Sequence, residues 1–164
     1  MAKKKPIMTN AMRMLDKAKI KYKSIEYSAD EVGDDFGCKI ADLLNLDRET
    51  TFKTLVARGD KTGIMVVCIP VANEVDLKKL ARVSGNKSAE MIHVKELLGL
   101  TGYIRGSVSP IGMKKKYPTY INDTALSHDE MAVSAGICGC SLIMKPEDLI
   151  KAIDGIAADV IKEN

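Results

Sequence analysis

The chain has 164 residues, a length at which one hydrophobic core is usual, so we predict a single domain over 1–164. Hydrophobic residues make up 46% and charged residues 29%, which is typical of a folded domain rather than a disordered chain. No apolar run approaches the roughly 20 residues that span a bilayer, and the basic start meets Pro6 rather than a signal sequence. We therefore expect a cytoplasmic protein without a membrane partner.

The net charge of +3 is unevenly distributed along the chain. Residues 1–25 carry eight lysines and arginines against the single Asp16, and Arg105 with Lys114–Lys116 lies in a stretch without acids. Clustered cations suit a phosphate backbone, because each contact releases counterions. They equally suit solvated helix faces, and charge alone leaves both interpretations open.

The first part of the chain predicts two helices with a strand between them. Thr9 can cap a helix whose apolar residues recur at helical spacing, and a short strand over 22–27 follows. A second helix would present Ile40, Leu43 and Leu44 on one face.

A β-hairpin is the strongest local pattern. The β-rich runs 51–58 and 64–70 are separated by 59–63, where two glycines and an aspartate favour a turn. The remaining predicted elements are a third helix that Asp76 or Asn73 caps and Gly85 ends, a helical stretch near 94–98, strands around 120–121, 131–134 and 141–144, and a last helix from Glu147 to about Ile161. This mixed order predicts an α+β fold: a compact, mixed, antiparallel-rich β-barrel or sheet flanked by helices.

Lys53 is unusual because it lies inside the predicted strand 51–58. Alternation puts it on one face with Leu55 and Ala57. A lysine on an apolar face needs a partner or a functional cavity, because an unpaired buried ammonium is costly. The alternative is an edge-strand lysine whose ammonium reaches water.

Two glycine-rich segments, 101–112 and 134–141, interrupt apolar sequence. Glycine lets the backbone approach a ligand closely and present its N–H groups. Segment 101–112 does not match a Walker A loop or a dinucleotide fingerprint and also fits a plain connecting loop, and segment 134–141 also fits a plain hairpin turn.

The cysteines are expected to be free thiols, because their spacing forms no disulfide-dense framework. A structural zinc site wants four ligands, and the only histidines, His93 and His128, show no paired spacing with Cys138 or Cys140. We predict no metal and no cofactor. No histidine pairs obviously with a cysteine, so we interpret the thiols as incidental rather than nucleophilic.

Five segments occur in an informative order. They are Tyr27 on the first strand, Phe-Lys-Thr-Leu at 52–55, Pro70-Val71-Ala72 followed by Asp76-Leu77-Lys78-Lys79, Thr-Gly-Tyr…Gly…Ser-Pro-x-Gly at 101–112, and Ser-x-Gly-x-x-Gly at 134–139. Together they resemble the YbaK/EbsC family of aminoacyl-tRNA deacylases, the superfamily of the prolyl-tRNA synthetase editing domain. The resemblance covers almost the whole chain.

The resemblance implies a small pocket for the aminoacyl end of a mischarged tRNA. Lys53 would anchor the terminal adenosine or the ester, and Gly106 would offer its backbone to the scissile carbonyl. Tyr27 and Thr54 complete the implied catalytic set. The implied substrate-binding residues are Ser134, Ser109, Ser141 and Gly136. Ser141 stands where family members often carry aspartate, which weakens the case for a carboxylate partner of Lys53.

The implied function is trans-editing: hydrolysis of mischarged aminoacyl-tRNA, above all Cys-tRNA(Pro), with the substrate thiol as nucleophile. The implied partners are the tRNA acceptor end and prolyl-tRNA synthetase. Three alternatives stay open: an Ala-tRNA(Pro) deacylase that uses water, a noncatalytic tRNA-binding module, and an ester hydrolase that acts on a small molecule.

Overall fold

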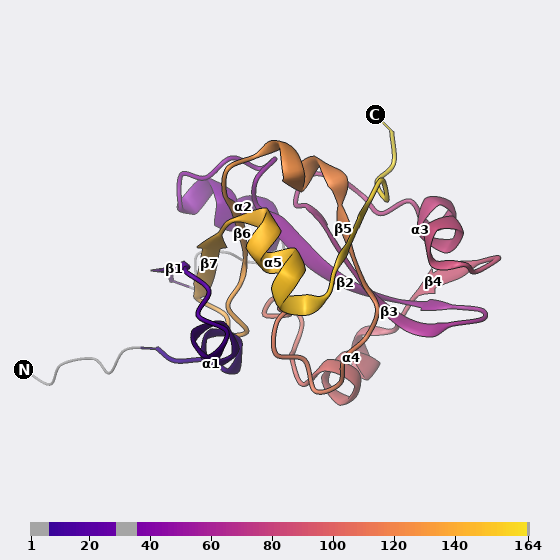
Figure 1. Cartoon of the computed structure of the whole chain (residues 1–164), viewed down its shortest axis with the longest axis horizontal. Helices are drawn as coiled ribbons and strands as arrows, with labels where there is room; N and C mark the ends of the chain where they lie inside the picture. Colours follow the sequence, from indigo (N-terminus) through magenta and orange to yellow (C-terminus); the bar gives the residue numbers. More distant parts are fainter. Residues whose placement is uncertain (1–6, 29–35, 164) are drawn as a thin grey trace, which may run out of the picture.

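The computed structural model describes residues 7–28 and 36–163, and Figure 1 shows their path. Five α-helices lie in this part of the chain: α1 (Asn10–Lys17), α2 (Phe36–Leu43), α3 (Leu77–Ser84), α4 (Val94–Thr101) and α5 (Pro146–Ile153). The strands are β1 (Lys23–Glu26), β2 (Phe52–Gly59), β3 (Gly63–Pro70), β4 (Ala89–Met91), β5 (Thr119–Asn122), β6 (Met131–Ser134), β7 (Cys140–Met144) and β8 (Ile156–Ala158). No helix among these residues has the length and apolarity to cross a bilayer.

The strands form two sheets, one of five strands in the order β4-β2-β3-β5-β8 and one of three strands in the order β1-β7-β6. The hairpin partners β2 and β3 pair antiparallel, while β5 pairs in parallel with both β3 and β8. A single parallel bridge between Thr51 and Ala132 links the two sheets. The α+β prediction is thus confirmed, but within the described residues the sheets do not close into a barrel.

Strand β2 contacts both hydrophobic cores. Phe52 belongs to a larger cluster that packs α1 and α5 against β6 and β7, whereas Ala57 belongs to a smaller cluster with Leu80 of α3. The predicted alternation explains this division, since successive side chains of a strand point to opposite faces. The β2–β3 hairpin therefore lies between the two hydrophobic clusters and contributes side chains to both.

Short polar side chains begin two helices as the sequence predicts. The Thr9 hydroxyl accepts a hydrogen bond from the Met12 N–H at 3.2 Å. At α3, Asp76 rather than Asn73 is the cap, because its carboxylate accepts the Lys78 and Lys79 N–H groups, each at 3.0 Å. Each cap satisfies donors that a helix start leaves without a partner.

The predicted last helix, Glu147 to Ile161, is wrong in its second half. Helix α5 ends at Ile153, because Asp154 adopts a left-handed conformation with φ of 51° and the chain turns at Gly155. The following residues form β8, whose apolar side chains extend the sheet beside β5. Strand β4 and the 3₁₀ helix at Asp123–Ser127 are further elements that the sequence patterns did not reveal.

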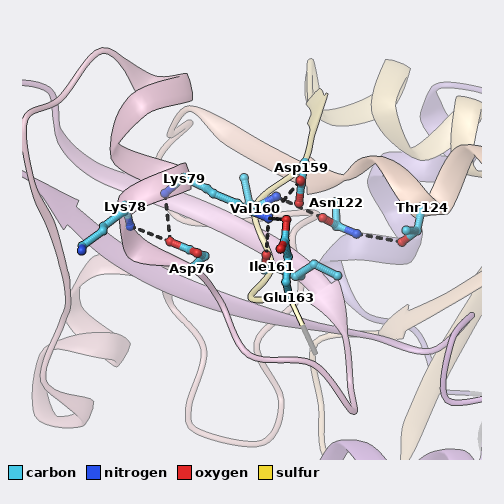
Figure 2. A network of polar contacts seen from close by, with 9 residues as sticks. All are labelled: Asp76, Lys78, Lys79, Asn122, Thr124, Asp159, Val160, Ile161 and Glu163. Carbon is cyan, nitrogen blue, oxygen red and sulfur yellow. Dashed lines mark hydrogen bonds and ion pairs between the residues drawn. The ribbon is translucent and has the colours of Figure 1, made fainter.

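After β8 the chain packs against the start of α3, as Figure 2 shows. The Lys79 ammonium donates to the Asp159 carboxylate at 3.0 Å and to the Ile161 carbonyl at 2.9 Å. The buried Asn122 side chain accepts the Val160 N–H at 3.1 Å. These contacts fix the C-terminal segment on the side of the large sheet that carries α3.

Candidate active site

A cavity of about 380 Å³ opens where β2, the 101–112 loop and the β6–β7 turn meet. This volume lies within the range of small-molecule sites. Its polar lining consists of Tyr27, Thr51, Lys53, Thr54, Arg105, Ser134 and Ser141, with Gly106 beside them. Its apolar lining consists of Ile40, Phe52, Leu55, Val56, Val71, Met91, Ile92, Val94, Leu97, Val108 and Val133.

Lys53 lies on the wall of this cavity and is half-buried. Its ammonium forms no hydrogen bond or ion pair with any other residue that the structure describes. Of the two interpretations of a strand lysine, the geometry favours a functional cavity, because Lys53 lines the cavity on the side of β2 that β4, paired only with Ala57–Gly59, leaves uncovered. The ammonium is available to a ligand that enters the cavity.

Tyr27 follows directly after β1 and lines the cavity. Its backbone N–H donates to the Gly139 carbonyl at 2.8 Å. Burial raises the pKa of the Tyr27 hydroxyl, although hydrogen bonds with the Gly139 backbone and the Ser141 side chain act in the opposite direction. The hydroxyl is therefore protonated at neutral pH and can donate a hydrogen bond.

Thr54 is buried, and its hydroxyl lies 3.7 Å from the Cys68 sulfur. Burial raises the pKa of the Cys68 thiol to about 12, so this sulfur is not a thiolate at neutral pH. None of the described lining residues is a cysteine. Cys138 is exposed, and Cys140 is buried.

The glycine-rich loop is held against the β6–β7 turn. Gly106 has a φ of 87°, a conformation that glycine adopts readily, and it turns the backbone toward the cavity. The Ser134 hydroxyl donates to the Ser107 carbonyl at 3.0 Å and accepts the Gly136 N–H at 3.1 Å. Ser134 thus connects two walls of the cavity while it lines the cavity itself.

Ser109 and Gly136 lie outside the cavity lining. Ser109 is fully buried, and its hydroxyl accepts the Ile111 N–H at 3.2 Å. At Gly136 a Cβ atom would come within 2.9 Å of the Tyr103 ring, so the glycine makes room for that ring. The Tyr103 hydroxyl donates to the Ile111 carbonyl at 2.6 Å, which ties the loop together.

The structure therefore brings together six of the eight residues that the sequence singled out. It adds two polar residues, Thr51 and Arg105, and an apolar side made by β4 and α4, including Met91, Val94 and Leu97. Arg105 entered the sequence analysis only as part of a basic stretch. The helical spacing of Val94 and Leu97 gave no sign that α4 lies beside Lys53.

The described residues contain no group of three or more histidine, cysteine, aspartate and glutamate side chains that could hold a metal ion. The polar groups of the described lining are an ammonium, a guanidinium, hydroxyls and backbone amides.

Comparison with known protein families gives a match to the aminoacyl-tRNA editing domain over residues 38–152. The chain belongs to this family. The match includes every polar residue of the cavity except Tyr27, which precedes it.

A relative is similar to this chain over almost its full length, beyond the range 38–152 that the family comparison matched. It is a protein of Enterococcus faecalis (strain ATCC 700802 / V583) with the provisional name Cys-tRNA(Pro)/Cys-tRNA(Cys) deacylase EbsC, 45% identical over 162 residues, which cover 98% of each chain.

Two solved structures share the editing-domain fold. One, described as a candidate trans-editing enzyme for prolyl tRNA synthetase, has a TM-score of 0.81 and 22% identity over 96% of this chain and 100% of that chain. The other, called only a hypothetical protein, has a TM-score of 0.84 and 19% identity over 94% of this chain and 100% of that chain. At these identities the likeness establishes the fold.

Proposed function

We propose that this editing-domain protein deacylates mischarged aminoacyl-tRNA in trans and that Cys-tRNA(Pro) is its main substrate. The observation that carries the proposal is the cavity of about 380 Å³, which is surrounded by hydroxyls, a loop glycine and a lysine that pairs with none of the described residues. The full-length relative with a Cys-tRNA deacylase name supports the choice of substrate.

An aminoacyl ester is already activated, so its cleavage needs positioning and stabilisation of the developing oxyanion more than a strong protein nucleophile. In our proposal the Lys53 ammonium anchors the ester or the terminal adenosine. The Gly106 N–H and the Tyr27 and Thr54 hydroxyls supply hydrogen bonds around the scissile carbonyl. Ser134 and Ser141 line the part of the cavity that receives the amino acid.

Ser109 and Gly136 act indirectly in this proposal. Their contacts with Ile111 and the Tyr103 ring shape the loop that carries Gly106. The absence of an acid among the described cavity residues agrees with Ser141 at the position of the family aspartate. Lys53 is then free to pair with the substrate.

The substrate's own thiol is the proposed nucleophile. Its sulfur attacks the ester carbonyl carbon, a C–S bond forms, the ester C–O bond breaks, and the thiol proton passes to the departing ribose oxygen. The product is a strained cyclic thioester that water then opens. The absence of cysteine from the described cavity lining and the high pKa of Cys68 leave no protein thiol in that role.

A panel of mischarged tRNAs tests the function. Cys-tRNA(Pro) should be hydrolysed at least about tenfold faster than Ala-tRNA(Pro) or Ser-tRNA(Pro), because alanine has no thiol and a hydroxyl ionises far less readily. The rate should rise with pH toward the ordinary thiol pKa of about 8.5.

Other results of the same panel identify the alternatives. Comparable turnover of Ala-tRNA(Pro) means a water nucleophile and an alanine-editing enzyme. Binding without turnover means a noncatalytic tRNA-binding module, and hydrolysis of simple esters regardless of tRNA means a small-molecule hydrolase.

The tRNA also needs a surface for its phosphates. A second groove lies between α1, β1, β7 and α5, and it is lined by Lys19, Lys21, Lys23, Lys145 and Lys151 together with Asp16, Glu130 and Asp148. Strand β1 runs from this groove at Lys23 to the cavity at Tyr27, a distance of about 13 Å for four extended residues. We propose that the groove contacts the acceptor stem. Residues 1–6 of the basic N-terminal cluster lie outside the described residues.

Prolyl-tRNA synthetase is the proposed protein partner, because a solved structure of the same fold is described as a candidate trans-editing enzyme for that synthetase. The cytoplasm, where such an encounter takes place, is the proposed location. Size-exclusion chromatography of the two purified proteins, with and without tRNA, tests the complex.

A further inference from the structure

Arg105 stands at the mouth of the cavity in an unusual electrostatic setting. Among the described residues that line the cavity, Lys53 and Arg105 are the only cations, and no acid lies with them. Lys53 is half-buried in the wall, whereas Arg105 is exposed. The Arg105 guanidinium forms no hydrogen bond or ion pair with any described residue.

An apolar shelf lies on the same mouth, and we define it as Met91, Val94 and Leu98. Met91 and Val94 line the cavity, yet they are 39% and 60% exposed, and Leu98, one helical turn beyond Val94, is 56% exposed. Exposed apolar side chains that gather beside a cavity mark an interaction surface.

The shelf is held firmly in place. The Arg58 guanidinium of β2 donates to the Glu96 carboxylate of α4 at 2.9 Å, and the same carboxylate accepts the His93 N–H at 3.1 Å. The Ile92 N–H donates to the Val56 carbonyl at 3.3 Å. These contacts join α4 and the segment before it to the strand that carries Lys53.

We infer that Arg105 and the apolar shelf bind the unpaired 3′-terminal nucleotides of the tRNA, an inference that rests on the proposed function. With the esterified ribose at Lys53, the rest of the strand must leave through the mouth. A base presents a flat apolar face that suits the shelf, and the phosphate joining the last two nucleotides suits a guanidinium fork. Arg105 is thus a positioning residue for the reaction.

The charge at the mouth favours a nucleic acid over a protein surface as the occupant. The described lining holds no acid, so a partner must bring the anion that pairs with the guanidinium. A protein helix would do so only if it carried an acid at that position, whereas every internucleotide linkage carries a phosphate. A nucleotide uses both the cation and the shelf at once.

A pair of substrates separates the phosphate contact from catalysis. One is a cysteinylated minihelix that ends in the single-stranded CCA sequence, and the other is cysteinyl adenosine, which carries the ester but no phosphate. Arg105→Gln should lower the ratio of kcat/KM for the minihelix to kcat/KM for cysteinyl adenosine about tenfold, as expected for one charge-assisted contact. Arg105→Lys should recover part of the ratio, and Lys95→Gln, which removes an exposed cation of α4 outside the cavity lining, should keep it.

A second variant tests the shelf. Val94→Ser should raise KM for the minihelix severalfold and have a smaller effect when the terminal nucleotide lacks its base. Ile156→Ser is the matched control, because Ile156 is a 51% exposed apolar residue of β8 outside the cavity lining.

If the ratio of kcat/KM for the minihelix to kcat/KM for cysteinyl adenosine is the same in Arg105→Gln and Lys95→Gln, the proposed phosphate contact is wrong. If Val94→Ser instead weakens only the capture of prolyl-tRNA synthetase, the shelf is a protein-docking surface and the inference is wrong. If the wild-type protein cleaves neither substrate, the proposed function fails, and minihelix binding by fluorescence anisotropy then decides the inference. Equal affinity of wild type and Arg105→Gln in that measurement would overturn it.

Discussion

Polar side chains near one end of β2 are hydrogen-bonded within the protein, whereas two cationic side chains near the other end are not paired with any described residue. At the hairpin end, the Asn86 side chain accepts the Lys61 and Thr62 N–H groups at 2.8 and 2.9 Å and donates to the Thr62 hydroxyl at 2.8 Å. The Asp60 carboxylate accepts the Lys87 and Ser88 N–H groups at 2.8 and 3.1 Å.

At the cavity end, Lys53 and Arg105, which line the same cavity, have no hydrogen-bond or ion-pair partner among the described residues. The polar groups at the hairpin end stabilise the fold, whereas the two cations at the cavity end are available to bind a ligand. A folded chain normally pairs its buried polar groups, so a cation held unpaired in a cavity points to a ligand.

The largest expected effect is at the cavity end. Lys53→Ala should lower single-turnover deacylation by about 100-fold or more, because the ester loses the group that anchors it in the reactive position. The free energy of unfolding should change by no more than about 1 kcal/mol, because the half-buried Lys53 forms no hydrogen bond or ion pair with any described residue. Lys61→Ala, at the exposed hairpin end, is the matched control and should retain the rate. Full activity of Lys53→Ala would remove Lys53 from the site.

Asn86→Ala should have the opposite profile. It leaves the Lys61 and Thr62 N–H groups without their acceptor, and we expect the free energy of unfolding to fall by about 1–3 kcal/mol in urea titrations. The deacylation rate per folded molecule should stay close to wild type. A rate loss as large as that of Lys53→Ala would show that the two ends are coupled.

A smaller effect is expected from the lysine groove. Replacing Lys19 and Lys21 together with glutamine should flatten the dependence of log affinity on log salt by about 1.8, if each lysine neutralises one phosphate of the acceptor stem. Glutamines at Lys61 and Lys87, near the hairpin end, provide the control. An unchanged slope in the first pair would mean that the groove is only solvated surface.

The smallest effect concerns acid stability at the hairpin end. Hydrogen bonds from the Ser88 and Lys87 N–H groups lower the pKa of the Asp60 carboxyl below its ordinary value. Ionised Asp60 therefore stabilises the folded state above the unfolded pKa of about 3.9, and this contribution is lost as pH falls through the folded pKa. Wild type should exceed Asp60→Asn in stability at pH 6, and the gap should narrow below pH 4 in thermal unfolding. A gap that is independent of pH would assign the effect to packing.

Much of the local structure could be predicted from the sequence, because its causes lie within a few residues. The turn at 59–63 sets the register of β2 and β3, and Thr9 and Asp76 cap their helices as their positions indicate. The strand position of Lys53 was enough to raise the question of a cavity, and Thr54 follows as its neighbour. The family resemblance then selected Tyr27, Gly106 and Ser134.

The end of the chain and the far side of the site depended on contacts between distant segments. Residues 156–158 become a strand because β5 offers an open edge there, an interaction that helical periodicity does not reveal. Arg105 and Val94 reach the cavity because the loop packs on the β6–β7 turn and the Arg58 and Glu96 side chains join α4 to β2. Local patterns report the preferences of neighbouring residues, whereas a binding site is assembled by packing across the sequence, and only the tertiary structure shows which side chains then share one cavity.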